Sequence, residues 1–295
     1  MKDTFAAYHP IINFTFFCAV ILCSMFFMHP VLLCISVLAS FSYSVYLNGR
    51  KALKFNLVFV LPVMIAVSLL NPLFNHRGLT ILGYMRENPI TLESIYYGMA
   101  SGLMFASIIL WFSCYNAVMT SDKFIYLFGR IAPALSLIFS MVLRFVPKFK
   151  TQIITISNAQ KCIGRDVNNG TYIERARHGI KILSVMITWA LENAIETADS
   201  MRSRGYGLKG RTSFSIFRFD TRDKGLLLLM MIFIIVIIAG SAAGQTNIQY
   251  FPSIKAGEIT VFSIFIYSAY FLLCFIPIIL DAAEEVKWHY FRSGI

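Results

Sequence analysis

The stretch that decides the fold is LLLLMMIFIIVIIAGSAA at residues 226–243, which contains no charged residue. A helix rises about 1.5 Å per residue, so about 20 apolar residues cross the roughly 30 Å of hydrocarbon in a bilayer. Within lipid such a stretch must be helical, because an open sheet would leave backbone groups without hydrogen bonds. Residues 226–243 therefore predict a transmembrane helix.

Five more stretches of similar character lie on either side of this one. They are residues 10–28, 31–47, 55–73, 94–120 and 259–280. The chain has 295 residues, of which 57% are hydrophobic and 14% charged, and this composition excludes disordered, collagen-like and disulfide-rich secreted proteins. We predict an all-α polytopic membrane bundle with about six spans in the plasma (inner) membrane.

The positive charge is concentrated in one part of the chain. Residues 121–224 contain 17 Lys or Arg and 8 Asp or Glu, a net of +9 out of +11 for the whole chain. The positive-inside rule places this segment, the loop at 48–54 with Arg50, Lys51 and Lys54, and both termini in the cytoplasm. We expect three regions: four spans in 1–120, a cytoplasmic region in 121–224, and two spans with a short cytoplasmic tail in 225–295.

Residues 131–146 leave two interpretations open. They are apolar, but they contain Arg144 and lie between Pro133 and Pro147. The segment is either a seventh, short or re-entrant span, or a helix beneath the bundle. We favour the second, because a full crossing would put the basic region outside the cell.

Two amphipathic helices are predicted in the basic region. The first runs from Pro147 to Ile163 and stops at Gly164, with apolar positions at Phe149, Ile153, Ile156 and Ile163. The second runs from about Arg175 to Arg204 and ends at Gly205, with apolar positions at Ile187, Leu191, Ala194, Ala198 and Met201. Glycine at both ends is typical of a helix C-terminus.

The small residues Ala190, Ala194 and Ala198 recur every four positions on the second helix. Such a row lets another helix approach closely, so the two helices are expected either to cross in an X or to pack beneath the membrane bundle. At the end of the second helix, Arg204 projects a guanidinium that suits bidentate pairing with a carboxylate of a partner. Alternatively, Arg202 and Arg204 offset the helix dipole without any partner.

Motifs of catalysis and cofactor binding are missing from the sequence. It has no GxxxxGK[ST] phosphate loop, and the GxGxxG match at 205–210 follows a helix, whereas a dinucleotide site must follow a strand. The histidines are scattered, the six cysteines occur mostly in apolar runs, and Glu192 and Glu196 flank no nucleophile. We predict no catalytic, cofactor or metal site, and no nucleic-acid partner.

The sequence around the second helix end resembles the transmembrane T component of energy-coupling factor (ECF) transporters, the family that includes the cobalt-uptake CbiQ proteins. The likeness extends over essentially the whole chain, and its most specific part is residues 188–212. The residues that carry it are Glu192, Asn193, Ala198, Asp199, Ser200, Met201, Ser203, Arg204, Gly205, Tyr206, Gly207, Gly210, Arg211 and Thr212.

The resemblance implies a non-catalytic subunit that works with other chains embedded in or attached to the lipid bilayer. In that family, two Ala-Arg-Gly-like tripeptides end two coupling helices and dock on two ATP-binding cassette ATPase subunits. The motion is passed to a small substrate-binding membrane subunit for vitamin or transition-metal uptake. ATP hydrolysis then belongs to the partners, which accounts for the missing phosphate loop.

Carried onto this chain, the second tripeptide is Ser203-Arg204-Gly205 and the first is Cys162-Ile163-Gly164. Ile163 stands where the family usually has Arg, so either Ile163 fills an apolar groove or Lys161 and Arg165, two positions away on each side, supply the charge. The resemblance also implies supporting roles nearby, at Ala159, Lys161, Arg165, Ala198, Asp199 and Arg202.

Two other functions remain as alternatives. The first is an autonomous secondary carrier that binds its own solute, although such carriers usually need ionisable groups within their spans and these are nearly absent here. The second is a membrane enzyme of lipid or isoprenoid metabolism, which would need an acidic or histidine motif.

Overall fold

The structure is a computed structural model that describes residues 4–85, 88–129, 132–165, 167, 170–208, 217–257 and 260–293. Its contacts divide the chain into two compact units, each described by itself. The membrane unit consists of Met1–Phe124 and Phe217–Ile295, and the central unit consists of Ile125–Ile216.

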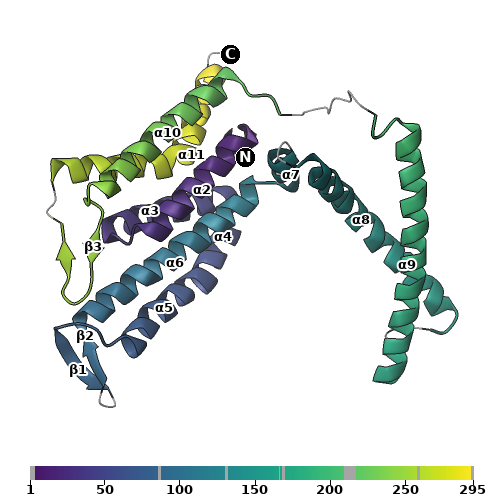
Figure 1. Ribbon diagram of the computed structural model, residues 1–295, viewed down its shortest axis with the longest axis horizontal. Helices are drawn as coiled ribbons and strands as arrows, with labels where there is room; N and C mark the ends of the chain where they lie inside the picture. The colour runs from purple at the N-terminus through teal and green to yellow at the C-terminus, as the bar shows by residue number, and fades with distance from the viewer. Residues whose placement is uncertain are drawn as a thin grey trace. The chain divides into compact units, whose positions relative to one another are not determined.

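Apolar helices build the membrane unit (Figure 1). They are α2 (Pro10–Phe26), α3 (Pro30–Asn48), the continuous α4, η1 and α5 (Arg50–Phe55, Asn56–Val60 and Leu61–Phe74), α6 (Leu92–Val118), α10 (Thr221–Ala242) and α11 (Val261–Ser293). Among the described residues, five helices are long and apolar enough to cross a membrane, and α2 is a shorter apolar helix of 17 residues. The predicted all-α, multi-pass membrane fold is confirmed.

Hydroxyl groups connect four helices in the interior of this unit. Ser36 Oγ of α3 lies 2.7 Å from Ser24 Oγ of α2 and 2.6 Å from Ser107 Oγ of α6, and it accepts a 2.9 Å hydrogen bond from Trp111 Nε1. The hydroxyl of Tyr270 on α11 reaches Ser24 at 3.2 Å. Lipid drives no hydrophobic association between helices, so polar contacts of this kind are a main source of helix pairing.

Two glycines bring α5 and α6 into close contact. A Cβ on Gly98 would lie 2.5 Å from the carbonyl oxygen of Ser68, and one on Gly102 would collide with the Ser68 hydroxyl and lie 2.7 Å from the carbonyl oxygen of Met64. Residues 98–102 read Gly-x-x-x-Gly, the spacing that lets membrane helices approach most closely. The close approach of α5 and α6 therefore depends on having glycine, with no side chain, at positions 98 and 102.

Short elements complete the membrane unit. An antiparallel hairpin of β1 (Ile81–Met85) and β2 (Asn88–Thr91) precedes α6, and a smaller hairpin of β3 (Ile248–Gln249) and β4 (Lys255–Ala256) precedes α11. A four-residue helix, α1 (Thr4–Ala7), precedes α2, and α7 (Ser121–Gly129) follows α6.

The central unit is dominated by α8 (Pro133–Cys162) and α9 (Tyr172–Ser203). The sequence predicted a break at Pro147, but α8 continues through this proline and unites residues 133–146 with the first amphipathic helix. An internal proline removes the hydrogen bond to the carbonyl of Leu143 and does not by itself end the helix. Among the described residues, α8 is not one of the helices apolar enough to cross a membrane.

Helices α8 and α9 pack against each other, as one of the two predicted arrangements requires, and cross in Figure 1. The prediction that the alanine row forms the crossing is wrong, however, because Ala194 and Ala198 are exposed. The contact is made by Ile156 of α8 with Ile182 and Met186 of α9, which belong to the same i, i+4 row as the alanines but lie earlier in the helix. Bulky apolar side chains bury more surface than a row of alanines, which explains the preference.

Aromatic and polar contacts extend the crossing. The ring of Phe149 meets Trp189 edge to face at 5.8 Å, and the ammonium of Lys148 lies 5.2 Å from the centre of the Trp189 ring. The same ammonium donates a 2.6 Å hydrogen bond to Asn193 Oδ1. Asn193, one of the residues that carry the family resemblance, thus contacts α8.

The start of α9 lies three residues before the predicted position near Arg175. Thr171 and Glu174 form a capping box, in which Glu174 accepts hydrogen bonds from the backbone and hydroxyl of Thr171, each at 2.9 Å. These bonds stabilise the carboxylate and lower the pKa of Glu174. The Thr-x-x-Glu pattern is a recognisable helix start that marks Tyr172 as the first helical residue.

Candidate functional site

The first predicted tripeptide forms the end of α8. The amide of Gly164 donates to the carbonyl of Lys161, and the amide of Arg165 donates to the carbonyl of Gln160, both at 3.0 Å. Gly164 has a φ of 77°, which glycine adopts without a steric penalty. These two bonds define a Schellman motif, in which a left-handed residue turns the chain away from the helix axis.

The second predicted tripeptide ends α9 in the same way. Gly205, with a φ of 74°, donates to the carbonyl of Arg202 at 2.9 Å, and Tyr206 donates to the carbonyl of Met201 at 3.0 Å. Ile163 and Arg204 therefore occupy equivalent positions, each immediately before the turning glycine. The alignment of the two tripeptides made from sequence corresponds to one shared backbone geometry.

The turn alone does not identify a functional site, because α10 ends with the same motif. There Gly244 has a φ of 78° and donates to the carbonyl of Ser241 at 2.9 Å. What differs is the side chain that precedes the glycine, which is Ala243 in α10 but an exposed Ile163 or Arg204 in the central unit. The candidate site is therefore defined by exposed side chains on a common turn.

The side chains around both tips are accessible. Ile163 is 62% exposed. The other residues named for this site from the sequence are also exposed: Cys162, Gly164, Ser203, Arg204, Ala159, Lys161, Arg165, Ala198, Asp199 and Arg202. Gly205 is half-buried. Tyr206, which carries part of the family resemblance, and Leu208 are exposed residues beyond the second tip that the predicted site did not include.

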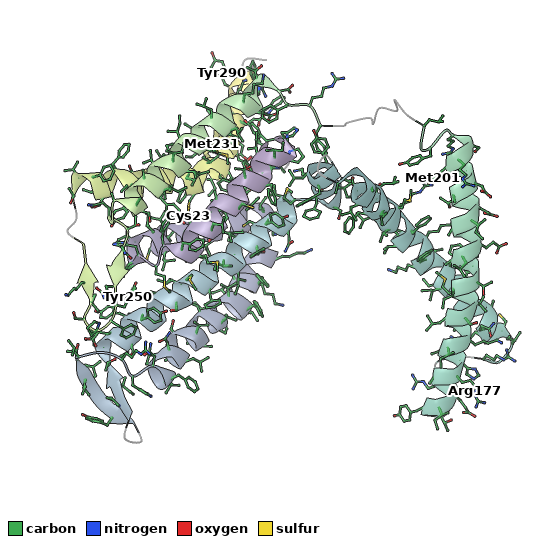
Figure 2. The ribbon with its side chains drawn as sticks, viewed as in Figure 1. Cys23, Arg177, Met201, Met231, Tyr250 and Tyr290 are labelled. Atoms are coloured by element: carbon green, nitrogen blue, oxygen red, sulfur yellow. The ribbon has the colours of Figure 1, made fainter. Side chains whose placement is uncertain are left out.

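The two tips do not form one composite site. Arg175 at the start of α9 donates a 2.8 Å hydrogen bond to the carbonyl of Val167, so the loop after the first tip is attached to that end of α9. The second tip lies at the opposite end of α9, where Figure 2 shows Met201 far from Arg177. A helix of 32 residues is about 48 Å long at about 1.5 Å per residue. The central unit therefore has two separate exposed helix ends.

The loops that follow both tips are described in part. Gly210, Arg211 and Thr212, which also carry the family resemblance, lie outside the described residues, as do Arg130 and Ile131 at the start of the ambiguous segment. The other residues of the second tip up to Leu208 are described.

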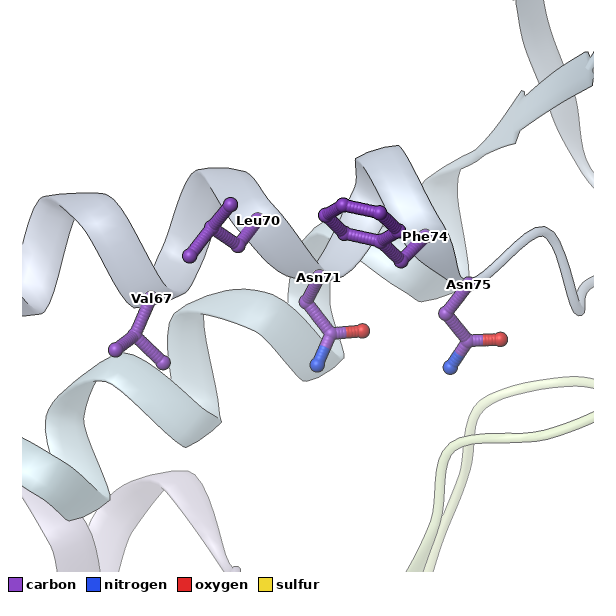
Figure 3. A pocket seen from close by; sticks show the side chains of 5 residues that line it. All are labelled: Val67, Leu70, Asn71, Phe74 and Asn75. Carbon is purple, nitrogen blue, oxygen red and sulfur yellow. The ribbon is translucent and has the colours of Figure 1, made fainter.

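Cavities in the membrane unit are lined by uncharged residues. One of about 320 Å³ lies along α5 between Val67 and Asn75 (Figure 3). Another, of about 590 Å³, lies beside Tyr97, Thr246 and Tyr250. Within the described residues, no group of three or more His, Cys, Asp or Glu side chains is placed to hold a metal ion.

Comparison with known proteins finds a family model and several similar proteins. The family model described as CbiQ, cobalt transport protein, matches residues 8–216, a range that includes both helix ends. The energy-coupling factor transporter transmembrane protein EcfT of Lactobacillus helveticus is 38% identical over 90 residues, covering 30% of this chain and 32% of that protein. The protein of the same name from Streptococcus thermophilus is 34% identical over 109 residues, covering 37% and 41%.

The matched region spans about a third of the length of these curated relatives, so the likeness to them is local. The family model, in contrast, covers well over half of the chain and contains α2 to α9. Together with the apolar helices and the two glycine-terminated helix ends, this match settles the family. The chain is a multi-pass membrane protein that belongs to the CbiQ family of cobalt transport proteins.

Proposed function

We propose that this protein is the non-catalytic energy-coupling membrane subunit of an ECF-type importer. The observation that carries the proposal is the pair of exposed helix ends at Ile163 and Arg204. Both end in the same hydrogen-bonded turn, and they are separated by about the length of α9. Two separated contact points suit two partner subunits. The relatives named as energy-coupling factor transporter transmembrane proteins support the same role.

In this function, two ATP-binding cassette ATPases dock on the two tips. When they close on ATP, α8 and α9 move and pass the motion to the membrane unit, which reorients a small substrate-binding membrane subunit for vitamin or transition-metal uptake. The sequence contains no phosphate loop, so ATP hydrolysis belongs to the partners. The solute is chosen by the substrate-binding subunit.

The roles at the tips follow from their chemistry. Arg204 supplies a guanidinium for a carboxylate in a groove of one ATPase, with Ser203 and Gly205 shaping the turn. Ile163 fills an apolar groove on the other ATPase, with Cys162 and Gly164 beside it and Lys161 and Arg165 available for charge at the rim. Ala159, Ala198, Asp199 and Arg202 line the last helical turns.

This function requires the central unit and both termini to face the cytoplasm, in line with the excess of Lys and Arg in residues 121–224. The terminal residues themselves lie outside the described part of the chain. The exposed thiol of Cys162 allows a test, in a chain whose other five cysteines are replaced by alanine. We expect a membrane-impermeant maleimide to label Cys162 in inverted vesicles but not in intact cells.

Purification from cells that express the ATPases tests the coupling role directly. We expect two ATP-binding subunits to co-purify in mild detergent, and we expect them to protect Cys162 from the maleimide. Thr188→Cys, at an exposed position in the middle of α9, is the matched control and should stay reactive. Recovery of a monodisperse chain without ATPases would contradict the proposal.

The autonomous carrier remains the alternative, and the same preparation distinguishes the two. A carrier would move its solute in vesicles that contain this chain alone. An energy-coupling subunit requires ATP, the ATPases and the substrate-binding subunit.

A further inference from the structure

The N-terminal segment 4–9, which we call the N-terminal brace, buries Phe5 and His9 although its helix has only four residues. Phe5 is fully buried, and its ring lies 5.1 Å from that of Phe16 and 6.3 Å from that of Phe17. A helix as short as α1 has no stability of its own in solution. Tertiary contacts must therefore hold this segment in place.

Lys123 holds the C-terminal end of α1. Its ammonium donates hydrogen bonds to the carbonyls of Ala6, at 2.6 Å, and Val118, at 3.0 Å, and the side chain is 7% exposed. Val118 is the last residue of α6, so one ammonium neutralises the carbonyl ends of two helices. Burial of a charged amine is costly unless it is hydrogen-bonded, which makes this contact specific.

Asn13 completes this part of the contact. In the orientation of its amide that satisfies both groups, it donates to the carbonyl of Phe5 and accepts from Lys123, each at 3.0 Å. At the other end of α1, the Asp281 carboxylate on α11 accepts a 2.8 Å hydrogen bond from the amide of Thr4. The short helix is thus held at both ends by side chains of other elements, Asp281 at its start and Lys123 near its end.

The last residue of the brace contacts the start of α10. The amide of His9 donates to Asp223 Oδ1 at 3.4 Å, and the His9 ring lies edge to face against Phe219 with 4.9 Å between centres. Asp223 also accepts a 3.0 Å hydrogen bond from the amide of Asp220 and so closes the capping box of α10. One carboxylate therefore fixes both the brace and the first turn of α10.

These contacts lie where the chain passes between its two units. The central unit is Ile125–Ile216, so Lys123 comes just before the chain enters it, and Phe219 and Asp223 follow just after the chain returns. The two crossing points are distant in sequence, yet both are tied to residues 4–9 within the membrane unit.

We propose that the N-terminal brace couples the two crossing points, so that motion arriving through either one displaces both together. The inference rests on the proposed function, because that function makes the central unit a carrier of motion. Elements that are packed and hydrogen-bonded together move as one body. If the two crossing points were anchored independently, a displacement of one would not reach the other. Lys123 acts here as a positioning residue.

Hydrogen exchange of the purified chain, without ATPases, tests the brace directly. Lys123→Met removes a contact at the first crossing point. We expect exchange to become about tenfold faster at amides 118–124 and also at 217–225, because the brace transmits the loss. Lys224→Met, an exposed lysine beside Asp223, is the matched control and should accelerate exchange at neither segment. Faster exchange confined to 118–124 would overturn the proposal.

Asp281→Asn is a second variant that keeps an acceptor for the Thr4 amide but removes the charge. We expect a smaller acceleration at the same two segments, which keeps the test decisive if Lys123→Met does not fold. Faster exchange in α11 that leaves both segments unchanged would contradict the brace.

The complex with its ATPases supplies the functional arm, with a non-hydrolysable ATP analogue as the probe. In the parent complex we expect the analogue to alter exchange at both segments, and in Lys123→Met at one of them or neither. If both segments of Lys123→Met respond as in the parent, the brace carries no motion. Failure of the parent to bind ATPases would instead contradict the proposed function, and the exchange results on the chain alone would still decide whether the brace exists.

Discussion

Ile163 and Arg204 have nearly the same backbone conformation, with φ and ψ of −97° and 18° for Ile163 and −83° and 10° for Arg204. Each precedes a glycine whose positive φ ends the helix. The two positions thus share one backbone geometry but carry different side chains, an apolar one at the first tip and a guanidinium at the second. If both tips dock on ATPases, their contributions to binding should differ in kind and size.

Replacing Arg204 by Ala should weaken ATPase association more than replacing Ile163 by Ala. Truncating one partner of a desolvated charge pair costs about 2 to 5 kcal/mol, whereas lost apolar burial at Ile163 costs about 1 to 3 kcal/mol. The measurement is the affinity of the ATPases for each variant in one background.

Two further substitutions check the physical reason. Arg204→Lys should restore part of the affinity, because an ammonium cannot form the bidentate pair. Ile163→Arg should not strengthen binding if the first groove is apolar. If Arg204→Ala assembles like the parent and Ile163→Ala does not, the first tip is the principal contact.

The turning glycines should respond to alanine in the opposite direction from a helical glycine. Gly164→Ala and Gly205→Ala force an alanine into the left-handed region and should lower the free energy of unfolding of the central unit by about 1 to 2 kcal/mol. Gly205→Ala should be the worse of the two, because its Cβ would lie 3.1 Å from Leu208 Cδ1 while that of Gly164 meets no neighbour.

Gly179→Ala is the matched control for this pair. It lies within α9, where a Cβ meets nothing within 4 Å, so alanine should raise the free energy of unfolding by about 0.5 to 1 kcal/mol. Thermal unfolding of the three variants gives the comparison. Equal destabilisation of all three would show that Gly164 and Gly205 are not needed for the conformation of the two helix ends.

Much of this fold is predictable because membrane spans are long and their composition is extreme. The uncharged run at 226–243 predicts α10 from composition alone, and the glycines after Ile163 and Arg204 mark both helix ends. Such signals are local in sequence: length, lack of charge, and a residue that tolerates positive φ.

The wrong predictions concern choices that sequence periodicity does not resolve. On α9, Ile182, Met186, Ala190, Ala194 and Ala198 form one row at a spacing of four residues, and only packing against Ile156 decides which part of that row is buried. The contacts of the N-terminal brace cannot be predicted from the sequence for a related reason, because Lys123 and its hydrogen-bond partner Ala6 are 117 residues apart in the chain. In contrast, Gly-x-x-x-Gly at 98–102 is a local sequence signal of the α5–α6 contact.

Gly102→Ala should loosen the packing of α5 on α6. Its Cβ would collide with the Ser68 hydroxyl and approach the carbonyl oxygen of Met64, which is backbone and cannot move away cheaply. Overpacking of this kind costs about 1 to 3 kcal/mol. Thermal unfolding in detergent should show it, with Gly225→Ala, where a Cβ meets no neighbour, as the control. Equal unfolding temperatures for the two variants would show that close approach at Gly102 is not needed.

The stability of the membrane unit should fall as His9 becomes protonated. Burial of the ring lowers the pKa of His9, and the nearby Asp223 carboxylate opposes this shift. Nδ1 of His9 also accepts a 3.3 Å hydrogen bond from the amide of Ile11 at the start of α2, which requires an unprotonated nitrogen. Because the folded chain favours the neutral ring, this stability is fully present above the ordinary pKa of about 6.5 and is lost as the pH falls through the lowered value.

The midpoint of thermal unfolding, measured at about pH 7.5 and about pH 5.5, checks this sign. Other groups also titrate over this interval, including His29, because burial lowers its pKa as well. The test is therefore the difference between the parent and His9→Asn. Asparagine can cap α2 without a titratable group and should leave a smaller drop on acidification. Because the His9 amide bonded to Asp223 is backbone, it survives the substitution, and the comparison isolates the ring. An equal or larger drop in His9→Asn would show that the neutral imidazole contributes nothing to stability.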